Sequence, residues 1–290
     1  MHIIENEFLK LTVAEHGAEI KSLINKATGE ELMWQADSTF WGRTAPVLFP
    51  VVGNYYQKKS IYDNKVYEMG QHGFARDMDF DLVLASADKL VFELKESKET
   101  LEKYPFEFLL TITYTISGKI VDINWNVKNV NNSTMYFSIG GHPAFNCDLD
   151  TYTLRFTKNG SPIDSFTANI IANDGSGCLS DETEVHNLTG GTLKMSDDLF
   201  SKDALIIENE QADAVTLVNP AGQNVITVTC PTPLFGVWSP VGKHAPFVCI
   251  EPWCGRCDRV GFNQLLEERE HGNILKANEE FNQNYQFILG

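Results

Sequence analysis

Residues Thr111–Lys128 read TITYTISGKIVDINWNVK, and this stretch decides the fold class. Apolar and polar side chains alternate along both halves, so each half has one apolar face and one polar face when extended. The Ser117–Lys119 segment between the halves contains Gly118 and suits a tight turn. The stretch therefore predicts a long antiparallel hairpin with one face toward water.

Period-two alternation and short apolar runs recur along the rest of the chain. Turn residues such as Thr28-Gly29 and Asn159-Gly160 separate these runs. Helix signals are few, and Phe262–Glu270 is one short candidate. Strands without intervening helices argue against β-α-β units and for antiparallel structure. The other predicted strands are Phe8–Val13, Glu19–Leu23, Val66–Met69, Phe80–Leu84, Leu90–Leu94, Leu154–Phe156, Leu205–Ile207, Ala214–Val218, Val225–Thr229 and Phe247–Ile250.

The predicted fold class is therefore all-β with antiparallel sheets and few short helices. The chain has 290 residues and shows no low-complexity linker, charge block or convincing repeat. Residues 1–290 are accordingly predicted to form a single domain, since β-sandwiches can reach about 200–250 residues as one unit. The polar Ile163–Thr192 region is interpreted as a long loop excursion within that domain.

Charge and cysteine content limit the function classes. The chain carries 39 acidic and 23 basic side chains, a formal charge of −16. Neither nucleic acid nor an anionic membrane is expected as a partner, because both require a basic face. No secretory signal and no apolar run near about 18 residues is visible, so a cytoplasmic location is predicted. The six cysteines, Cys230 among them, are scattered and are predicted to be reduced thiols.

Two stretches contain the strongest acid–base candidates. Gly140–Asn146 reads GGHPAFN and presents His142 after the strand-like run Met135–Ile139. Glycine and proline suit a stiff turn that displays a titratable ring. Glu251 follows an apolar strand in Val248–Trp253, where partial desolvation raises a carboxyl pKa and suits it to act as a base. The structural alternatives are a histidine that satisfies a local carbonyl and a glutamate that pairs with an arginine.

Two further stretches present arginine and histidine. Trp41–Gly53 brackets an apolar core with glycines and prolines, and it holds Arg43, whose planar guanidinium suits ring oxygens or a carboxylate. Met69–Asp77 places His72 and Arg76 in a glycine-flanked turn between predicted strands. A surface ion pair for Arg43 and a polar hairpin tip around His72 are the structural alternatives.

Other catalytic signatures are weak in this sequence. The pair Cys254 and Cys257 has no second Cys-x-x-Cys and no thioredoxin-like context, so we interpret it as incidental thiols. A two-histidine, one-carboxylate metal site stays open as a minor alternative, although the usual compact ligand spacing is missing. The sequence has no Gly-x-Ser-x-Gly elbow, dinucleotide fingerprint or Walker loop. A glycosidase usually needs two carboxylates, and only Glu251 stands out.

Taken in chain order, these motifs resemble the aldose 1-epimerase (mutarotase) family, and more closely its bacterial subgroup related to glucose-6-phosphate 1-epimerase. The resemblance implies a large antiparallel β-sandwich of the galactose mutarotase type, with a sugar pocket on one sheet. The continuation Cys254–Asp258 differs from typical galactose mutarotases, so the sugar is left open. The matching segments are Gly42–Gly53, Gln71–Arg76, Gly140–Phe145 and Ile250–Trp253.

The resemblance also implies roles for the matched residues. His142 would act as the general acid that protonates the ring oxygen, and Glu251 as the general base that removes the proton from O1. The stiff turn is expected to hold His142 across the pocket from Glu251, a sugar's width away. The residues matched to sugar binding are Arg43, His72, Arg76 and Asp203.

The predicted function is aldose 1-epimerization of a hexose, the interconversion of its α and β anomers. Ring opening requires one group to accept the O1 proton and another to protonate the ring oxygen, so no metal or cofactor is expected. The expected partner is a small-molecule sugar, and the chain is expected to be a monomer or homodimer. A non-catalytic sugar-binding or sensing module and a hexose-6-phosphate 1-epimerase stay open as alternatives.

Overall fold

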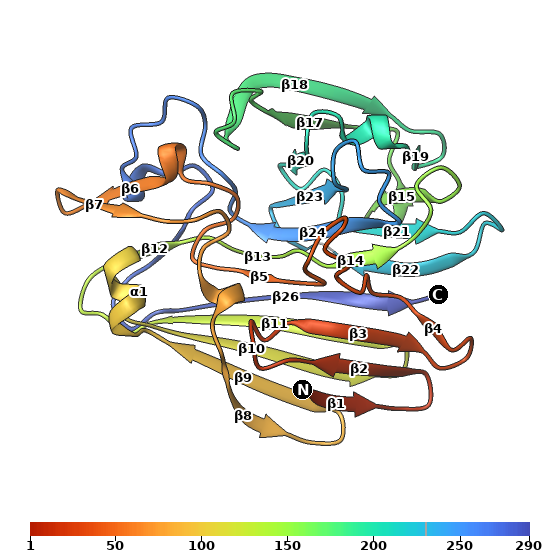
Figure 1. Ribbon diagram of the computed structural model, residues 1–290, viewed down its shortest axis with the longest axis horizontal. Helices are drawn as coiled ribbons and strands as arrows, with labels where there is room; N and C mark the ends of the chain where they lie inside the picture. Colours follow the sequence, from red (N-terminus) through yellow and green to blue (C-terminus); the bar gives the residue numbers. More distant parts are fainter. Residues whose placement is uncertain (230) are drawn as a thin grey trace.

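Two large antiparallel sheets dominate the structure, a computed structural model that describes residues 1–229 and 231–290 (Figure 1). Cys230, one of the cysteines predicted to be reduced, lies outside the described residues; the five described cysteines are free. The first sheet contains the predicted hairpin and is called the hairpin sheet. The second carries most of the candidate site and is called the pocket sheet.

The hairpin sheet has ten strands. Its order is β16 (Ser161–Pro162), β15 (Thr153–Lys158), β21 (Ala214–Val218), β22 (Asn224–Thr229), β26 (Glu280–Leu289), β11 (Ile120–Asn129), β10 (Phe108–Ser117), β9 (Lys89–Lys95) and β8 (Asp81–Ala85), with β19 (Thr192–Lys194) beside β15. The pocket sheet has eight strands. Its order is β18 (Leu179–Asn187), β17 (Ser165–Ile171), β20 (Leu205–Glu208), β23 (Leu234–Trp238), β24 (Phe247–Cys254), β13 (Ile139–Gly141) and β5 (Val47–Leu48), with β14 (Ala144–Asn146) also paired to β24.

Smaller elements complete the fold. The N-terminal sheet has the order β1 (His2–Glu5), β2 (Leu9–Val13), β3 (Ile20–Asn25) and β4 (Glu30–Glu31). Two strand pairs are β6 (Lys59–Tyr62) with β7 (Lys65–Glu68), and β12 (Met135–Phe137) with β25 (Asn273–Leu275). The helices are α1 (Lys98–Lys103) and the 3₁₀ turns η1 (Tyr56–Lys58), η2 (Ala75–Asp77), η3 (Asp197–Phe200) and η4 (Leu266–Glu268). Within the described residues, none of the helices is long and apolar enough to cross a membrane.

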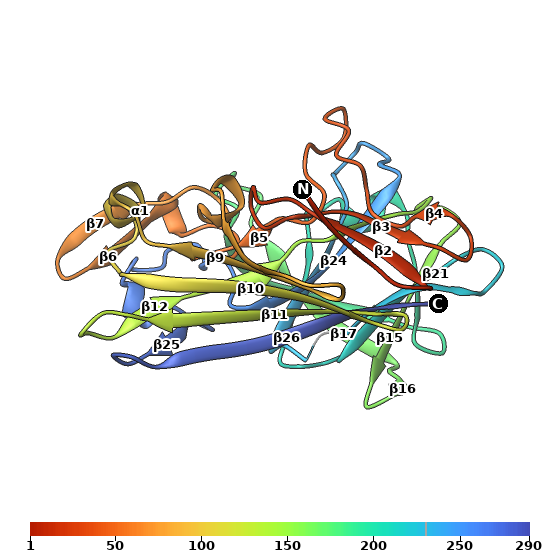
Figure 2. The ribbon, with the colours of Figure 1, turned by 90° about the horizontal axis from the view of Figure 1, so that it is seen from below.

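The hairpin sheet and the pocket sheet pack face to face. Aromatic rings bridge them, with centroids 5.2 Å apart for Phe145 and Phe287 and 6.3 Å apart for Phe156 and Phe235. The N-terminal sheet covers another part of the same apolar face, where the Tyr114 hydroxyl donates to the Ala18 carbonyl at 2.5 Å. Figures 1 and 2 show this N-terminal sheet beside β10 and β11. The predicted antiparallel β-sandwich is confirmed.

The predicted hairpin is present as β10 and β11. Ser117 pairs with Ile120, so Gly118 and Lys119 form the turn. Buried and partly exposed residues alternate along both strands, as the sequence pattern predicted. Figure 2 shows β10, β11 and β26 running side by side, and Trp125 is fully buried at the centre of β11.

Two local predictions were wrong. The Ile163–Thr192 region, interpreted as a loop, contains β17 and β18. Most of β18 is exposed and polar because it lies at the edge of the pocket sheet, which removed the apolar alternation that marks a strand. The Phe262–Glu270 segment, proposed as a helix, forms only η4, because Arg269 and Glu270 are held by side-chain pairs elsewhere in the fold.

The packing of the hairpin predicts the effect of truncating its largest buried side chain. Trp125→Ala should lower the free energy of unfolding by about 3–5 kcal/mol, because it leaves a cavity in a close-packed core. Urea denaturation followed by circular dichroism measures the change. As a control, Thr115→Ala on the partly exposed face should cost less than about 1 kcal/mol. Equal losses for the two variants would contradict this assignment of faces.

Candidate active site

A cavity of about 360 Å³ opens on the pocket sheet. This volume lies within the range of about 300–1,000 Å³ that is typical of small-molecule sites. Strands β23 and β24, the turn between β13 and β14, and several loops supply its wall. Five of the six predicted site residues line it: His72, Arg76, His142, Asp203 and Glu251.

Strand β24 places Glu251 inside the pocket sheet. Gly236 of β23 pairs with Glu251 on one side, and on the other side Trp253 pairs with Gly140. Glu251 therefore lies within a strand that continues to Cys254, and the predicted strand end at Ile250 was too early. The strand passes through Pro252 because the ladder to β13 begins only at the following residue, so that edge requires no N–H from the proline.

The turn that carries His142 is fixed to β24 at both ends. Strand β13 pairs through Gly140 with Trp253, and β14 pairs through Ala144 with Cys249. His142 lies between these two short strands, and its backbone N–H donates to the Pro46 carbonyl at 3.1 Å. The turn is thus held by backbone hydrogen bonds from two directions.

The glycines of this turn provide space. The φ angles of Gly140 and Gly141 lie outside the left-handed region, so the backbone conformation itself does not require glycine at either position. A Cβ at Gly140 would lie 2.6 Å from the Trp253 ring, and one at Gly236 would also lie 2.6 Å from it. The Trp253 indole therefore occupies the space above both glycines and forms part of the pocket wall.

His142 and Glu251 are direct neighbours. Nε2 of His142 lies 3.4 Å from Oε2 of Glu251, and the side chains are 8% and 1% exposed. The expectation that a sugar's width separates them was wrong, because the turn that carries His142 is paired at both ends with β24, the strand that carries Glu251. The His142 ring stacks on Trp41 with centroids 4.7 Å apart and meets the edge of Trp238 at 5.4 Å. These rings fix the orientation of the imidazole.

Burial controls the protonation of this pair. It raises the pKa of Glu251 well above its usual value, with opposition from the Trp253 indole and reinforcement from Asp203. It lowers the pKa of His142 to about 3, and the positive charges of Arg76 and Arg43 add to that effect. Burial thus disfavours the charged form of both groups, so a neutral imidazole beside a protonated carboxyl is favoured over the imidazolium–carboxylate pair, and the two groups share one transferable proton.

The His72 ring meets the His142 ring in a T-shaped contact, with centroids 5.5 Å apart. His72 has a left-handed φ of 66°, and its backbone N–H donates to the Gly53 carbonyl at 2.7 Å. Its Nδ1 accepts the Gly53 N–H at 3.0 Å, so the neutral ring carries its proton on Nε2. Burial, followed by the charges of His142, Arg76 and Arg43, holds the pKa of His72 well below its usual value. His72 is therefore a fixed neutral donor.

The two predicted arginines differ in position. Arg76 lines the cavity from η2 and donates to the Gln71 carbonyl at 2.7 Å. Its buried Nε has no hydrogen-bond partner in the part of the chain that the structure describes. Arg43 is not among the lining residues and donates to Asp77 at 2.7 Å, as in the ion-pair alternative. Its predicted contact with the sugar stays a prediction.

Asp203 lies at the mouth of the cavity, just before β20. It has a left-handed φ of 74°, and its carboxylate accepts the N–H of Ala204 at 2.8 Å. Desolvation raises the pKa of Asp203, while the backbone of Ala204 and the Trp238 indole oppose that shift. The Asp203 carboxylate thus lines the cavity from a fourth segment of the chain, after β24, the His142 turn and the segment of His72 and Arg76.

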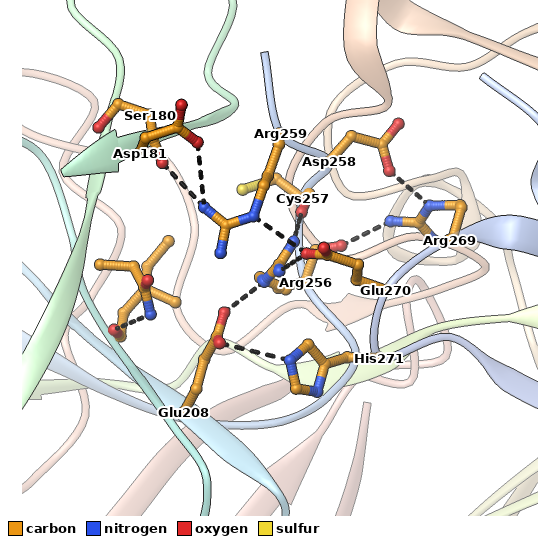
Figure 3. Close-up of polar contacts among 12 residues, drawn as sticks. Ser180, Asp181, Glu208, Arg256, Cys257, Asp258, Arg259, Arg269, Glu270 and His271 are labelled. Carbon is orange, nitrogen blue, oxygen red and sulfur yellow. Dashed lines mark hydrogen bonds and ion pairs between the residues drawn. The ribbon is translucent and has the colours of Figure 1, made fainter. Parts of the chain in front are cut away.

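A network of charged side chains supports the pocket wall that contains Cys257 (Figure 3). Arg256 is buried between Glu208 and Glu270 and donates to the Cys257 carbonyl at 2.8 Å. Burial alone would raise the pKa of Glu208, but His271 and Arg256 together lower it to about 2.

The same network reaches His72 through a backbone contact. A Cβ at Gly53, whose φ is +70°, would lie 2.6 Å from the Cβ of Cys257. Gly53 in turn donates to His72 Nδ1. Arg256 and its partners therefore help to set the position of the His72 ring.

The thiols near the site are protonated groups. Burial raises the pKa of Cys254 and of Cys257 to about 12, which disfavours thiolate chemistry at the Cys-x-x-Cys pair. Among the described residues, His142, Cys249 and Glu251 form a buried group of potential metal ligands that does not include His72. An exposed group consists of Asp148, Asp150 and His244.

Some contacts in the cavity wall could not be predicted from the sequence. Trp41 and Trp238 lie in different segments, and their contact with His142 depends on tertiary packing. Gln71 and Ile206 also line the cavity. Only the match to a known motif singled out Gln71, and nothing in the local pattern singled out Ile206.

The fold has close counterparts among solved structures. A galactose mutarotase related enzyme from Lactobacillus acidophilus superposes with a TM-score of 0.92 at 33% identity, covering 100% of this chain and 97% of that chain. A galactose mutarotase-like protein from Lactobacillus casei ATCC 334 gives a TM-score of 0.90 at 33% identity and covers both chains fully, at 100% each. The molecule is thus a galactose mutarotase-like β-sandwich.

Sequence similarity extends along almost the whole chain. The family model for aldose 1-epimerase matches residues 1–287. The plasmid-encoded protein LacX of Lactococcus lactis subsp. lactis is 30% identical over 288 residues, which cover 94% of this chain and 91% of that protein. The chain belongs to the aldose 1-epimerase family and is thereby a sugar isomerase. Its relation to the glucose-6-phosphate subgroup stays a prediction.

The charged network predicts a stability difference between two arginines that share Glu270. Arg256→Met should lower the free energy of unfolding by about 3–5 kcal/mol, because the buried Glu208 loses its arginine partner and keeps only His271. The control Arg259→Met removes a partly exposed contact to the same carboxylate and should cost about 1 kcal/mol or less. Urea denaturation of both variants tests this, and a smaller loss for Arg256→Met than for Arg259→Met would refute it.

Proposed function

We propose that the protein interconverts the α and β anomers of a hexose, with His142 as general acid and Glu251 as general base. The observation that carries this proposal is the buried 3.4 Å contact between Nε2 of His142 and Oε2 of Glu251. Positioned acid and base groups typically contribute about 10²–10⁴-fold each to such proton transfers. The sugar-sized cavity around the pair supports the same conclusion.

The short distance between the two groups suits the chemistry. O1 and the ring oxygen of a hexopyranose are both bonded to C1, so they lie next to each other. An acid and a base that are themselves adjacent can address both oxygens from one side of the sugar. Glu251 takes the O1 proton, His142 donates to the ring oxygen, and the bond between C1 and the ring oxygen breaks to leave a C1 carbonyl.

The proton transfers of ring opening and closure balance without exchange with solvent. Burial favours the shared proton on Glu251, and its transfer to His142 gives the carboxylate and imidazolium that ring opening needs. After opening, the proton from O1 is on Glu251 and the proton from His142 is on the former ring oxygen. Rotation about the C1–C2 bond presents the other carbonyl face, and reversed transfers close the ring as the second anomer. The reaction as proposed requires no cofactor.

The remaining polar groups are proposed to bind the sugar. His72 presents its Nε2–H, and Arg76 presents a partly buried guanidinium whose Nε has no hydrogen-bond partner among residues 1–229 and 231–290. Asp203 offers an acceptor at the cavity mouth. Trp41 and Trp238 frame the acid and supply apolar surface for the C–H faces of the ring.

An enzyme is favoured over a sugar-sensing module by the burial of Glu251. Burying a carboxyl costs free energy, and a module that only binds sugar does not require an adjacent acid–base pair. A hexose 6-phosphate is the alternative substrate. Only Arg76 of the two motif arginines lines the cavity, and Arg256 is already engaged by two glutamates, which supports an unphosphorylated sugar.

The acid–base assignment predicts the loss of anomerization in two variants. Glu251→Gln and His142→Asn should each lower kcat by about 10²–10⁴-fold, because each removes one proton-transfer group. Polarimetry or NMR of freshly dissolved α-glucose, α-galactose and their 6-phosphates measures the rate. The surface variants Glu210→Gln and His244→Asn serve as controls and should keep the wild-type rate. Full activity in both active-site variants would rule out the assignment.

The positions of the two arginines predict different binding defects. Arg76→Met should raise KM by roughly 10-fold or more, because a charged donor to the sugar is lost. Arg43→Met should change KM far less, since Arg43 pairs with Asp77 outside the lining. Initial-rate kinetics on the preferred anomer measure both values. An equal or larger effect of Arg43→Met would restore the direct contact that the motif comparison implied.

A further inference from the structure

The acid–base pair has a third polar neighbour that the proposed reaction does not use. His142, Cys249 and Glu251 each offer one donor atom, and these atoms all lie within 4.8 Å of one another. Cys249 and Glu251 are two residues apart on β24, so both side chains project from the same face of the strand. Ala144, two residues after His142, pairs directly with Cys249. Backbone pairing therefore fixes all three side chains together.

The spacing of two donors already matches that of a metal site. Zinc binds imidazole nitrogen at about 2.0–2.1 Å and carboxylate oxygen at about 2.0–2.2 Å, which places two tetrahedral ligands about 3.4 Å apart. Nε2 of His142 and Oε2 of Glu251 are separated by 3.4 Å. Oε2 is buried and, within the described part of the chain, accepts no hydrogen bond. Oε2 is thus a buried acceptor that lies close to the donor atoms of His142 and Cys249.

The donor set selects a class of cation. A thiolate, an imidazole and a carboxylate together suit zinc and similar thiophilic divalent ions, whereas magnesium and calcium prefer oxygen ligands only. The cavity borders His142 and Glu251, so a fourth position can be taken by water. Three protein ligands and one open position form the usual coordination of an accessible zinc ion.

We propose that His142, Cys249 and Glu251 form a binding site for Zn²⁺ or a similar thiophilic divalent ion, and that the bound ion inhibits the enzyme. Binding takes the Nε2 lone pair of His142 and an oxygen of Glu251, and it displaces the thiol proton of Cys249 to solvent. The metal and the sugar then compete for the same two groups. The inhibitory part rests on the proposed anomerase function, whereas metal binding does not.

Binding is tested directly on the metal-free full-length protein. Isothermal titration with Zn²⁺ measures affinity, and Co²⁺ reports a thiolate ligand through its sulfur-to-metal charge-transfer absorption. Cys249→Ala should remove that absorption and weaken Zn²⁺ binding by about 100-fold or more, since it deletes a ligand. The matched control is Cys254→Ala, a buried cysteine on the opposite face of the same strand, and it should bind as the wild type does. Wild-type protein that binds no Zn²⁺, or Cys249→Ala that binds it equally well, overturns the proposal.

Inhibition is tested by the rate of anomer equilibration. Saturating Zn²⁺ should lower the wild-type rate by about 100-fold or more, because the acid and the base are both sequestered, and excess EDTA should restore it. Cys249→Ala should keep the metal-free rate and resist Zn²⁺. A metal-free protein that needs Zn²⁺ for activity would overturn the inhibitory role. Zinc binding without any anomerase activity would leave the site standing and refute the proposed function instead.

Discussion

The pairing of β24 along both of its edges is the constraint on which the site depends. Burying a carboxyl beside an imidazole is unfavourable unless the surrounding backbone holds both in place. Strand β23 fixes Glu251 from one side, while β13 and β14 fix the His142 turn from the other. The protonation preferences of the pair follow from that burial. A ligand can reach the pair from the cavity, because the paired strands lie to either side of β24.

Much of the fold could be predicted from local alternation. The β10–β11 hairpin was found with its turn because one face is apolar over its whole length. Strand β18 was missed because an exposed edge strand carries polar residues on both faces. The end of β24 was misplaced because proline usually ends a ladder, whereas Pro252 sits where its neighbour needs no N–H. Such context is set by a partner strand and cannot be read from the strand itself.

The candidate site was predicted unevenly for the same reason. Five predicted residues line one cavity, and each was found because it lies in a short motif that the local sequence marks. These residues are His72, Arg76, His142, Asp203 and Glu251. Arg43 looked equivalent in sequence, yet its side chain is held by Asp77. The separation of His142 from Glu251 was misjudged because it depends on strand order in the pocket sheet. Neighbours such as Trp41 and Trp238 have no local pattern that joins them.

The space shared by Trp253 and its two glycines has a consequence for sequence divergence. Because an added methyl group at either Gly140 or Gly236 meets the indole, the three positions are coupled. A lineage that gains alanine at one of these glycines is expected to need a smaller residue at position 253. If the residue at position 253 becomes smaller first, the pocket wall is left with an unfilled space above both glycines. Changing this part of the pocket wall by directed evolution therefore calls for paired libraries, in which a smaller residue at position 253 is combined with a larger residue at position 140 or 236.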